Sequence, residues 1–432
     1  MSFHSLVLRA AVATCILAAA VSGRAAGPLS LDEAIRHATA RSRQLDAHNA
    51  AAAAARERAV AAGQPANPVL KIGINNLPVT GADRYRLTPD FMTMRSVGVM
   101  QEITRADKLK SRAGRFEREA DAALAGSAVA LAQLRRDTAL AWLDLMYQQR
   151  MAALMRGLLA ESALQVTATD TAYSVGRGSQ ADSFVARSAV AHIEDRLHQS
   201  VLLVAAATTR LERWIGSPAH QTLGAAPPLA VTQLDSGTLE AHLEHHPQIQ
   251  LMMRLEALAQ AEVQVAQKAK SSDWSVELMF SQRGPAYSNM LSVNLSIPLQ
   301  WDQKNRQDRE VAARLALLEQ LRAEREEASR DHLAQARAWL QQWRGNQRRM
   351  ENYDATLVPL AAQRTQASIA AYRGGAGSLV GALQARQAEI DVQLDRLKLE
   401  METSSLWAQL EYLLASDGQK TAPPTNSREA QP

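Results

Sequence analysis

The sequence reads YSVGRGSQADSFVAR from Tyr173 to Arg187 and YRGGAGSLVGALQAR from Tyr372 to Arg386. The two stretches share a tyrosine, two glycines, a serine, an alanine and an arginine at one constant offset. A helix ends readily at a glycine, because glycine adopts the left-handed conformation without a Cβ clash. The serine that follows can then cap the next helix. Each stretch is therefore predicted to be the tip of an αα-hairpin, and the hairpin occurs twice.

A long stretch rich in Ala, Leu and Arg enters each tip, and another leaves it. The entering stretches contain few glycines, and the first contains no proline, so we expect very long helices. The residues predicted to build the two tip turns are Tyr173, Gly176, Gly178, Tyr372, Gly375 and Gly377.

The same order of elements surrounds each tip. The first structural repeat is predicted at 27–215, with a helix at 31–62, a β-hairpin at 69–103 and a helical hairpin at 105–214. Ser30 and Glu33 are predicted to form a capping box at the start of its first helix. A proline-rich connector follows at 216–238. The second repeat is predicted at 239–415, with a helix at 239–270, a β-hairpin at 274–299 and a helical hairpin at 304–414. The polar tail at 416–432 is expected to be disordered.

Residues 1–26 have the features of a cleaved secretory signal peptide. Arg9 precedes an apolar run, and small residues follow it. Cys15 is the only cysteine. A lipoprotein signal centred on Cys15 is an alternative, but the apolar run continues past this cysteine. No later stretch reaches the roughly 18 apolar residues of a membrane helix, so we expect an exported protein that crosses no bilayer by a helix.

Charge and motifs exclude several classes of function. The formal net charge is +4 for 432 residues, and loss of the signal peptide leaves it near neutral, which argues against nucleic-acid binding. The sequence contains no His-Glu-x-x-His motif, P-loop or nucleophile elbow. We therefore expect neither an enzyme nor a cofactor.

The predicted strands alternate apolar and polar residues over about ten positions, which is the length of a transmembrane β-strand. In the third strand, Val276, Leu278 and Phe280 alternate with Ser275, Glu277 and Met279. Trp274 and Trp301 lie where strands meet helices, as expected of aromatic residues at a membrane interface.

Four strands cannot close a barrel, and lipid does not tolerate open strand edges. The subunits must therefore pool their strands: two subunits give eight strands and three give twelve. At about 1.5 Å per residue the long helices span roughly 100 Å. The sequence thus predicts a mostly α protein with duplicated helix–β-hairpin–helix repeats, in which a transmembrane β-barrel is continued by a helical tube with coiled-coil packing.

This order of elements, repeated twice, is similar to that of the TolC-type outer-membrane efflux proteins. The resemblance covers about residues 28–415. Besides the two tips, it is carried by Leu31-Asp-Glu-Ala-Ile, Pro65-Ala-Asn-Pro68, Gln101-Glu102 and Ile297-Pro-Leu299. The stretch from Asp83 to Glu102 looks most like the heavy-metal (Czc/Cus-type) branch.

The resemblance implies a homotrimer with a 12-stranded β-barrel in outer-membrane lipid and an α-helical barrel in the periplasm. Its tips would dock a periplasmic adaptor (a membrane fusion protein), which joins an inner-membrane RND antiporter. The function implied is a passive duct for heavy-metal cations. Alternatives are a duct for drug efflux or type I protein secretion, and a soluble periplasmic coiled-coil adaptor.

Family members narrow the tunnel entrance with charged residues on the tips, typically aspartates. The first tip keeps one acid, Asp182, whereas the second has Gly381 and Gln384 at the matching positions. Arg177 and Arg373 add positive charge. Our hypothesis is that Asp182, Arg177, Arg373 and Gln384 lie at the constriction. The alternative is that Asp182 only stabilises the first turn of its helix.

Two clusters were weighed as metal sites. His242, His245 and His246 stand where the second repeat begins, and we expect solvated helix-start residues there instead of ligands. Met92, Met94 and Met100 can offer thioethers to Cu(I) or Ag(I). Methionine is also an ordinary packing residue, so we expect no metal site.

Overall fold

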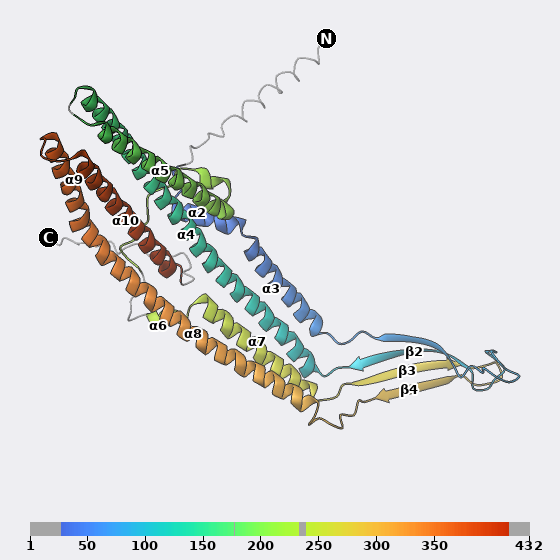
Figure 1. Ribbon diagram of the computed structural model, residues 1–432. Helices are drawn as coiled ribbons and strands as arrows, with labels where there is room; N and C mark the ends of the chain where they lie inside the picture. The colour runs from blue at the N-terminus through green and yellow to red at the C-terminus, as the bar shows by residue number, and fades with distance from the viewer. Residues whose placement is uncertain (1–26, 177, 233–238, 414–432) are drawn as a thin grey trace, which may run out of the picture. The chain divides into compact units, whose positions relative to one another are not determined.

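The computed structural model describes residues 27–176, 178–232 and 239–413 (Figure 1). The predicted signal peptide with Cys15, Arg177, the end of the connector and the predicted tail lie outside these residues. Among the described helices, none is long and apolar enough to cross a membrane.

The elements of the first repeat are α2 (Leu31–Arg41), α3 (Arg43–Ala62), β1 (Val69–Asn75), β2 (Met94–Ile103), α4 (Ala106–Ser174) and α5 (Gln180–Ile215), followed by the short helix η1 (Ser217–His220). Those of the second repeat are α6 (Leu239–Leu243), α7 (Pro247–Ala269), β3 (Trp274–Gln282), β4 (Met290–Ser296), α8 (Gln307–Asn352), the π-helical turn η2 (Tyr353–Leu357), α9 (Val358–Arg373) and α10 (Leu379–Glu411).

Three predicted helices are interrupted in the structure. The helix expected at 31–62 is broken at Ser42, which has an extended backbone. The helix expected at 239–270 is broken before Pro247, which opens α7, because a proline lacks the N–H that a helix interior requires. The long helix expected at 304–372 contains the π turn before Pro359.

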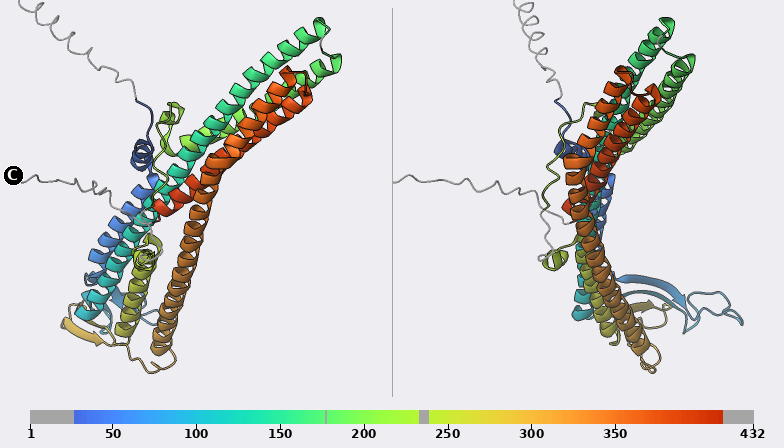
Figure 2. Two further views of the ribbon diagram at one scale, coloured as in Figure 1. Left: turned by 90° about the vertical axis from the view of Figure 1, so that its left-hand side faces the viewer. Right: turned by 60° about the vertical axis from the view of Figure 1, so that its left-hand side comes forward.

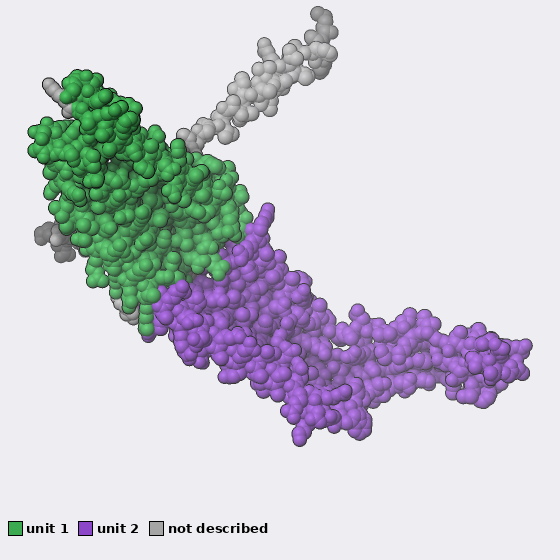
Figure 3. All heavy atoms as spheres, in the orientation of Figure 1, with its two compact units in different colours: residues 1–42, 133–236, 336–413 green, residues 43–132, 237–335, 414–432 purple. Residues whose placement is uncertain are grey.

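Two compact units make up the chain, and both take residues from each sequence repeat (Figure 3). Unit 1 contains residues up to Ser42, Gln133–Ser236 and Ala336–Leu413. Unit 2 contains Arg43–Ala132 and Gly237–Gln335. The sequence repeats are therefore not the units in which the chain packs.

Unit 1 holds the two helical hairpins and the first helix. Its core is built on α4, where Trp142, Leu143 and Tyr147 are fully buried. The indole Nε1 of Trp142 donates a hydrogen bond to the carbonyl of Leu29 at 3.2 Å. Ser30 caps α2 in a reciprocal capping box with Glu33, as the sequence predicts. Figure 2 shows the hairpins α4–α5 and α9–α10 side by side within this unit.

The π turn changes which side of the second long helix faces the core. The sequence of this helix has an apolar stripe at three- and four-residue spacing, formed by Ala336, Trp339, Trp343, Met350, Tyr353, Leu357 and Leu360. Trp343 is buried, but Leu360 is 56% exposed, because a π turn adds a residue and shifts the helical phase. Asp354 of this turn receives a bidentate contact from Arg396 of α10, at 2.7 and 3.1 Å.

Unit 2 contains a single antiparallel sheet of order β1-β2-β3-β4. The central pair, β2 with β3, joins strands from the two repeats, with Val99 opposite Leu278. The strands have 7, 10, 9 and 7 residues, so β1 and β4 are shorter than the ten residues expected. Pairing of β4 stops before Pro298, which has no N–H to donate to a neighbouring strand.

A clamp in unit 2 fixes the start of β3 to the start of α4. Lys108 Nζ lies 2.8 Å from Asp273 Oδ2, and both side chains are largely buried. The other oxygen of Asp273 accepts a hydrogen bond from the backbone N–H of Arg105, just before α4. The sheet and the helix that follows β2 therefore hold a fixed arrangement at this junction.

Candidate functional site

Both hairpin tips use the same turn. Gly176 and Gly375 have φ angles of 72° and 74°, in the left-handed region that favours glycine. At the second glycine of each tip the space is restricted instead. A Cβ on Gly178 would lie 3.3 Å from the backbone N of Tyr173, and one on Gly377 would lie 3.1 Å from Cβ of Ala371. The paired glycines thus have separate roles, one conformational and one steric.

The helices that leave the tips are capped differently. Ser179 accepts a hydrogen bond from the N–H of Asp182 at 3.2 Å, and the Asp182 carboxylate accepts one from the N–H of Ser179 at 3.1 Å. The Ser179 hydroxyl also donates to this carboxylate at 2.7 Å, and this hydrogen bond, together with the one from the Ser179 N–H, lowers the pKa of Asp182 below its usual range. Ser378 caps α10 through the N–H of Gly381 at 3.1 Å. The second tip therefore keeps the serine cap and lacks the acid.

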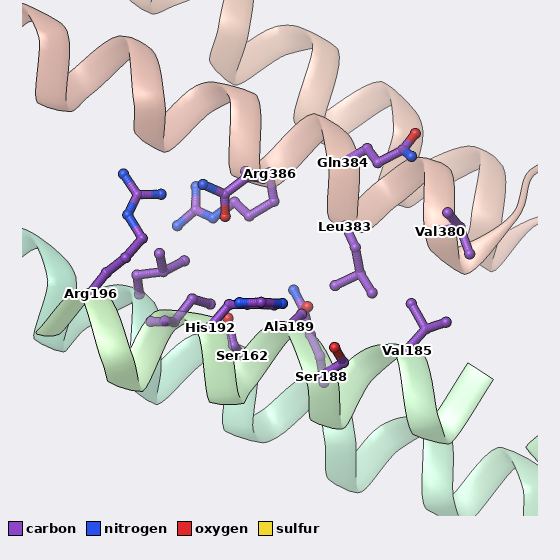
Figure 4. Close-up of a pocket in the computed structure, with 14 residues that line it drawn as sticks. Ser162, Val185, Ser188, Ala189, His192, Arg196, Val380, Leu383, Gln384 and Arg386 are labelled. Carbon is purple, nitrogen blue, oxygen red and sulfur yellow. The ribbon is translucent and has the colours of Figure 1, made fainter. Parts of the chain in front are cut away.

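Arg177 lies outside the described residues, and the other residues predicted at the tips, Arg373 and Gln384, do not hydrogen-bond to Asp182. Within the described part of the chain, the hydrogen bonds of Asp182 go to Ser179 alone. Arg373 is the exposed last residue of α9. Gln384 lies on α10 and faces a groove (Figure 4). A role of these residues at a constriction stays a prediction.

The groove runs between the two hairpins of unit 1, has a volume of about 520 Å³ and is lined by α4, α5 and α10 (Figure 4). Its apolar lining includes Val185, Ala189, Val380 and Leu383, and His192 lies among them. Two arginines at its rim are paired. Arg196 contacts Asp391 at 3.0 Å, and Arg386 pairs with Glu161 and with Glu389.

Sequence reasoning missed this groove, because the tip motif does not show which contacts its arginine makes. Arg187 and Arg386 hold the same position in the two tip motifs. Arg187 pairs with Asp170 inside its own hairpin, whereas Arg386 reaches Glu161 of the other hairpin. The equivalent arginines therefore form ion pairs in different places, one within a hairpin and one between the two hairpins.

One face of the sheet in unit 2 is apolar and exposed. The register places two complete rows across four strands, Leu70–Val99–Leu278–Val293 and Ile72–Val97–Phe280–Leu291. The exposed fraction reaches 78% at Ile72 and 68% at Val293. The opposite face is polar and more covered, with Lys71 Nζ 2.7 Å from Glu277 Oε2. This is the alternation that the sequence predicts.

The predicted interfacial tryptophans lie at the helical end of this sheet. Trp274 opens β3 opposite Ile103. Trp301 lies in the turn between β4 and α8 and is 87% exposed. Two large aromatic side chains thus border the apolar face on the side where the helices begin.

The structure does not bring the three methionines to one point. Met94 and Met100 are six residues apart on β2, which at about 3.4 Å per residue separates them by roughly 20 Å. Among the described residues, no group of three His, Cys, Asp or Glu side chains is arranged to hold a metal ion.

The histidine cluster takes a form that we did not predict. The side chain of His242 lies outside the described atoms. His246 is not a solvated residue but caps α7, with Nδ1 accepting a hydrogen bond from the N–H of Gln248 at 3.2 Å. Its ring stacks on His332 of α8, with centroids 4.4 Å apart. Burial and the neighbouring His332 lower the pKa of His246 to about 4.

Solved structures of similar fold were found, although the sequence matches no family model and no curated protein. A membrane protein from Pseudomonas aeruginosa matches with a TM-score of 0.76 at 16% identity, over 89% of this chain and 90% of that one. The outer membrane protein VceC of Vibrio cholerae matches with a TM-score of 0.71 at 16% identity, over 89% and 95% of the two chains.

The CusC channel matches with a TM-score of 0.73 at 15% identity, over 88% of this chain and 91% of that one. Its Cus-type name agrees with the branch that the sequence resembles, but its score is no higher than that of the Pseudomonas protein. The chain has the fold of outer-membrane channels. The comparison does not separate the heavy-metal branch from the others.

We predict that Gly176→Ala weakens the first tip by roughly 1–2 kcal/mol, because alanine is strained in the left-handed region. Gly157→Ala is the control, since a Cβ there meets nothing within 4 Å in the regular helix α4. Amide hydrogen exchange at the tip measures local opening directly. Faster exchange is expected in the first variant alone, and equal rates would contradict the turn described here.

We also predict that the start of α7 loses stability as the pH falls from about 6.5 to about 4. In this window the unfolded chain binds a proton at His246 that the folded chain does not, so the free energy of unfolding decreases with falling pH. The total loss is on the order of 3 kcal/mol. His246→Asn keeps a capping acceptor without titrating.

Hydrogen exchange of α7 amides at pH 7 and pH 4.5 distinguishes the two proteins. After correction for intrinsic exchange rates, wild type should exchange faster at the lower pH, and His246→Asn should respond less, because only His332 then has a pKa lowered by burial. The same pH response in both would show that His246 is not the titrating group.

Proposed function

We propose that this chain is the subunit of an outer-membrane channel in a tripartite efflux system. The observation that carries the proposal is the apolar face of the β1–β4 sheet, whose side chains lie in register and are exposed. Water does not favour so large an apolar surface on a soluble protein, whereas lipid does. The fold shared with solved outer-membrane channels supports the same function.

A homotrimer with a 12-stranded barrel is the proposed assembly, and the open edges of the sheet support it. Within the described residues, β1 and β4 each have one edge without a partner strand. In lipid these backbone groups need partners, and a neighbouring subunit can supply β4 for β1. Three subunits give twelve strands, which leave room for a lumen.

The hairpin tips and the groove between the hairpins are the proposed contact with a periplasmic adaptor, through which an inner-membrane RND antiporter delivers substrate. The groove combines an apolar floor with charged rims, which suits an amphipathic helix of a partner. The duct itself is passive, so the energy for export comes from the antiporter.

Heavy-metal cations are the proposed substrate, on the basis of the resemblance of residues 83–102 to the Czc/Cus-type branch. Drug efflux and type I protein secretion are the alternatives that the same fold serves. A soluble periplasmic adaptor is the remaining alternative, and it does not account for the exposed apolar rows on the sheet.

We predict that Val293→Arg prevents stable assembly in the outer membrane, because a lipid-facing arginine near the bilayer midplane costs roughly 2–4 kcal/mol per subunit. Ser292→Arg is the matched control, since Ser292 is the next residue of β4 and lies on the polar face. Fractionation of cell envelopes measures the outcome. Equal amounts of both variants in the outer membrane would exclude a lipid-facing role for this surface.

We predict that Asp182→Asn lowers the preference of the channel for cations. An asparagine oxygen can still accept the hydrogen bond from Ser179, so the change removes charge and keeps the cap. Gly381→Asp is the reciprocal variant, which adds the missing acid to the second tip and should raise the preference. Single-channel recordings in planar bilayers give the ion selectivity, and unchanged selectivity in both variants would leave Asp182 with its capping role alone.

A further inference from the structure

A single arginine interrupts the apolar face of the sheet. Arg95 is paired with Ile74 on β1 and with Gln282 on β3. Residues alternate sides along a strand, so Arg95 lies on the same face as Val97 and Val99. Its side chain is exposed. A guanidinium therefore shares the surface that we assign to lipid.

Arg95 lies at one border of that surface. The next two rows along β2, at Val97 and Val99, are apolar, the third pairs Gln101 with Val276, and the row at the far end pairs Ile103 with Trp274. From Arg95 to Ile103 is eight residues, or about 27 Å along an extended strand. Tilted by 35–45° as in outer-membrane barrels, this length spans about 19–22 Å of the membrane, close to their apolar band of about 25 Å. Trp274 thus lies at the border of the apolar face next to the helices, and Arg95 lies at its border next to the loops.

The loop end of the sheet has unpaired positive charge. Residues 76–95 and 282–290 are all described, and they contain Arg84, Arg86, Arg95 and Arg283 without a single ion pair. The two acids in these segments are Asp83 and Asp90. The carboxylate of Asp90 accepts hydrogen bonds from the backbone N–H groups of Met92 and Thr93 instead of pairing with an arginine.

The helical end of the sheet is different. There, Lys108 pairs with Asp273, Arg105 with Asp107, and Lys270 with Asp308. Among the described residues, Arg86 and Arg95 have no ion-pair partner and are available to an external anion, whereas Arg84 and Arg283 lie over the rings of Tyr85 and Tyr287.

Backbone packing brings the two loops together. A Cβ on Gly284 would lie 2.0 Å from the carbonyl oxygen of Thr88, so the loop after β3 packs directly on the loop before β2. Arg86 lies two residues from this contact, and Gln282, the strand partner of Arg95, lies two residues from it on the other side. Arg86 and Arg95 therefore belong to one end of one surface.

We propose that Arg95, assisted by Arg86, binds the phosphate of a membrane-lipid headgroup at the outer border of the barrel. A guanidinium offers paired donors that match phosphate oxygens. Its cost on a lipid-facing strand falls to near zero at the interface. A lipid is the occupant because Arg95 shares its face with Val97 and Val99, so the ligand that reaches it also covers apolar side chains. This inference rests on the proposed function.

The test uses the full-length protein in neutral detergent. Retention of phosphatidylglycerol, with phosphatidylcholine as the zwitterionic comparison, is measured by native mass spectrometry. Wild type should retain the anionic lipid preferentially. Arg95→Gln should weaken that retention roughly tenfold, the size expected for a lost charged hydrogen bond. The control, Arg105→Gln, removes a paired arginine at the opposite border and should leave retention unchanged.

Arg86→Gln provides a second variant in an exposed loop, where folding does not depend on the side chain, and it should weaken retention by a few-fold. Equal retention by wild type and both variants would overturn the inference. So would full displacement of the lipid by inorganic phosphate, which would identify an adventitious anion site. Envelope fractionation of the wild type is independent, because absence from the outer membrane would refute the proposed function itself.

Discussion

The pairing of β2 with β3 is the interaction on which the architecture depends. It connects residues about 180 positions apart in sequence, from Arg95 opposite Gln282 to Ile103 opposite Trp274. Without it the chain would contain two separate two-stranded hairpins, which are marginally stable in water. With it, both hairpins share one register, and that register aligns their apolar side chains into continuous rows. The exposed apolar surface of the sheet is therefore a product of long-range pairing.

The two hairpin tips show how one turn can be retained while its surroundings change. Gly176 and Gly375 supply the same left-handed residue, and Ser179 and Ser378 supply the same cap. The acid of the first tip and the bridging arginine of the second are not shared. The turn is constrained by backbone geometry, whereas the side chains around it are free to take on separate electrostatic contacts.

The sequence predicted those features that depend on neighbouring residues, namely helix caps, tight turns and the alternation of strands. The capping box at Ser30, the glycines of the tips and the alternation along β3 each depend on residues within a few positions of one another. The break at Pro247 was also predictable, because a proline cannot continue the helix that precedes it. The predicted helix at 239–270 was wrong at this point. The stacked pair of His246 and His332 and the groove between the hairpins were not predictable. They depend on how distant helices pack, and no short motif encodes that.

The π turn at Tyr353–Leu357 distinguishes the second long helix from the first, which runs from Ala106 to Ser174 without such a turn. A wider turn next to a proline has fewer regular hydrogen bonds across it, so the bending stiffness of this helix is lowest there. Arg396 of α10 forms a bidentate ion pair with Asp354 in this turn. The second hairpin consequently has one irregular turn in its long helix, and this turn has its own ion pair to α10.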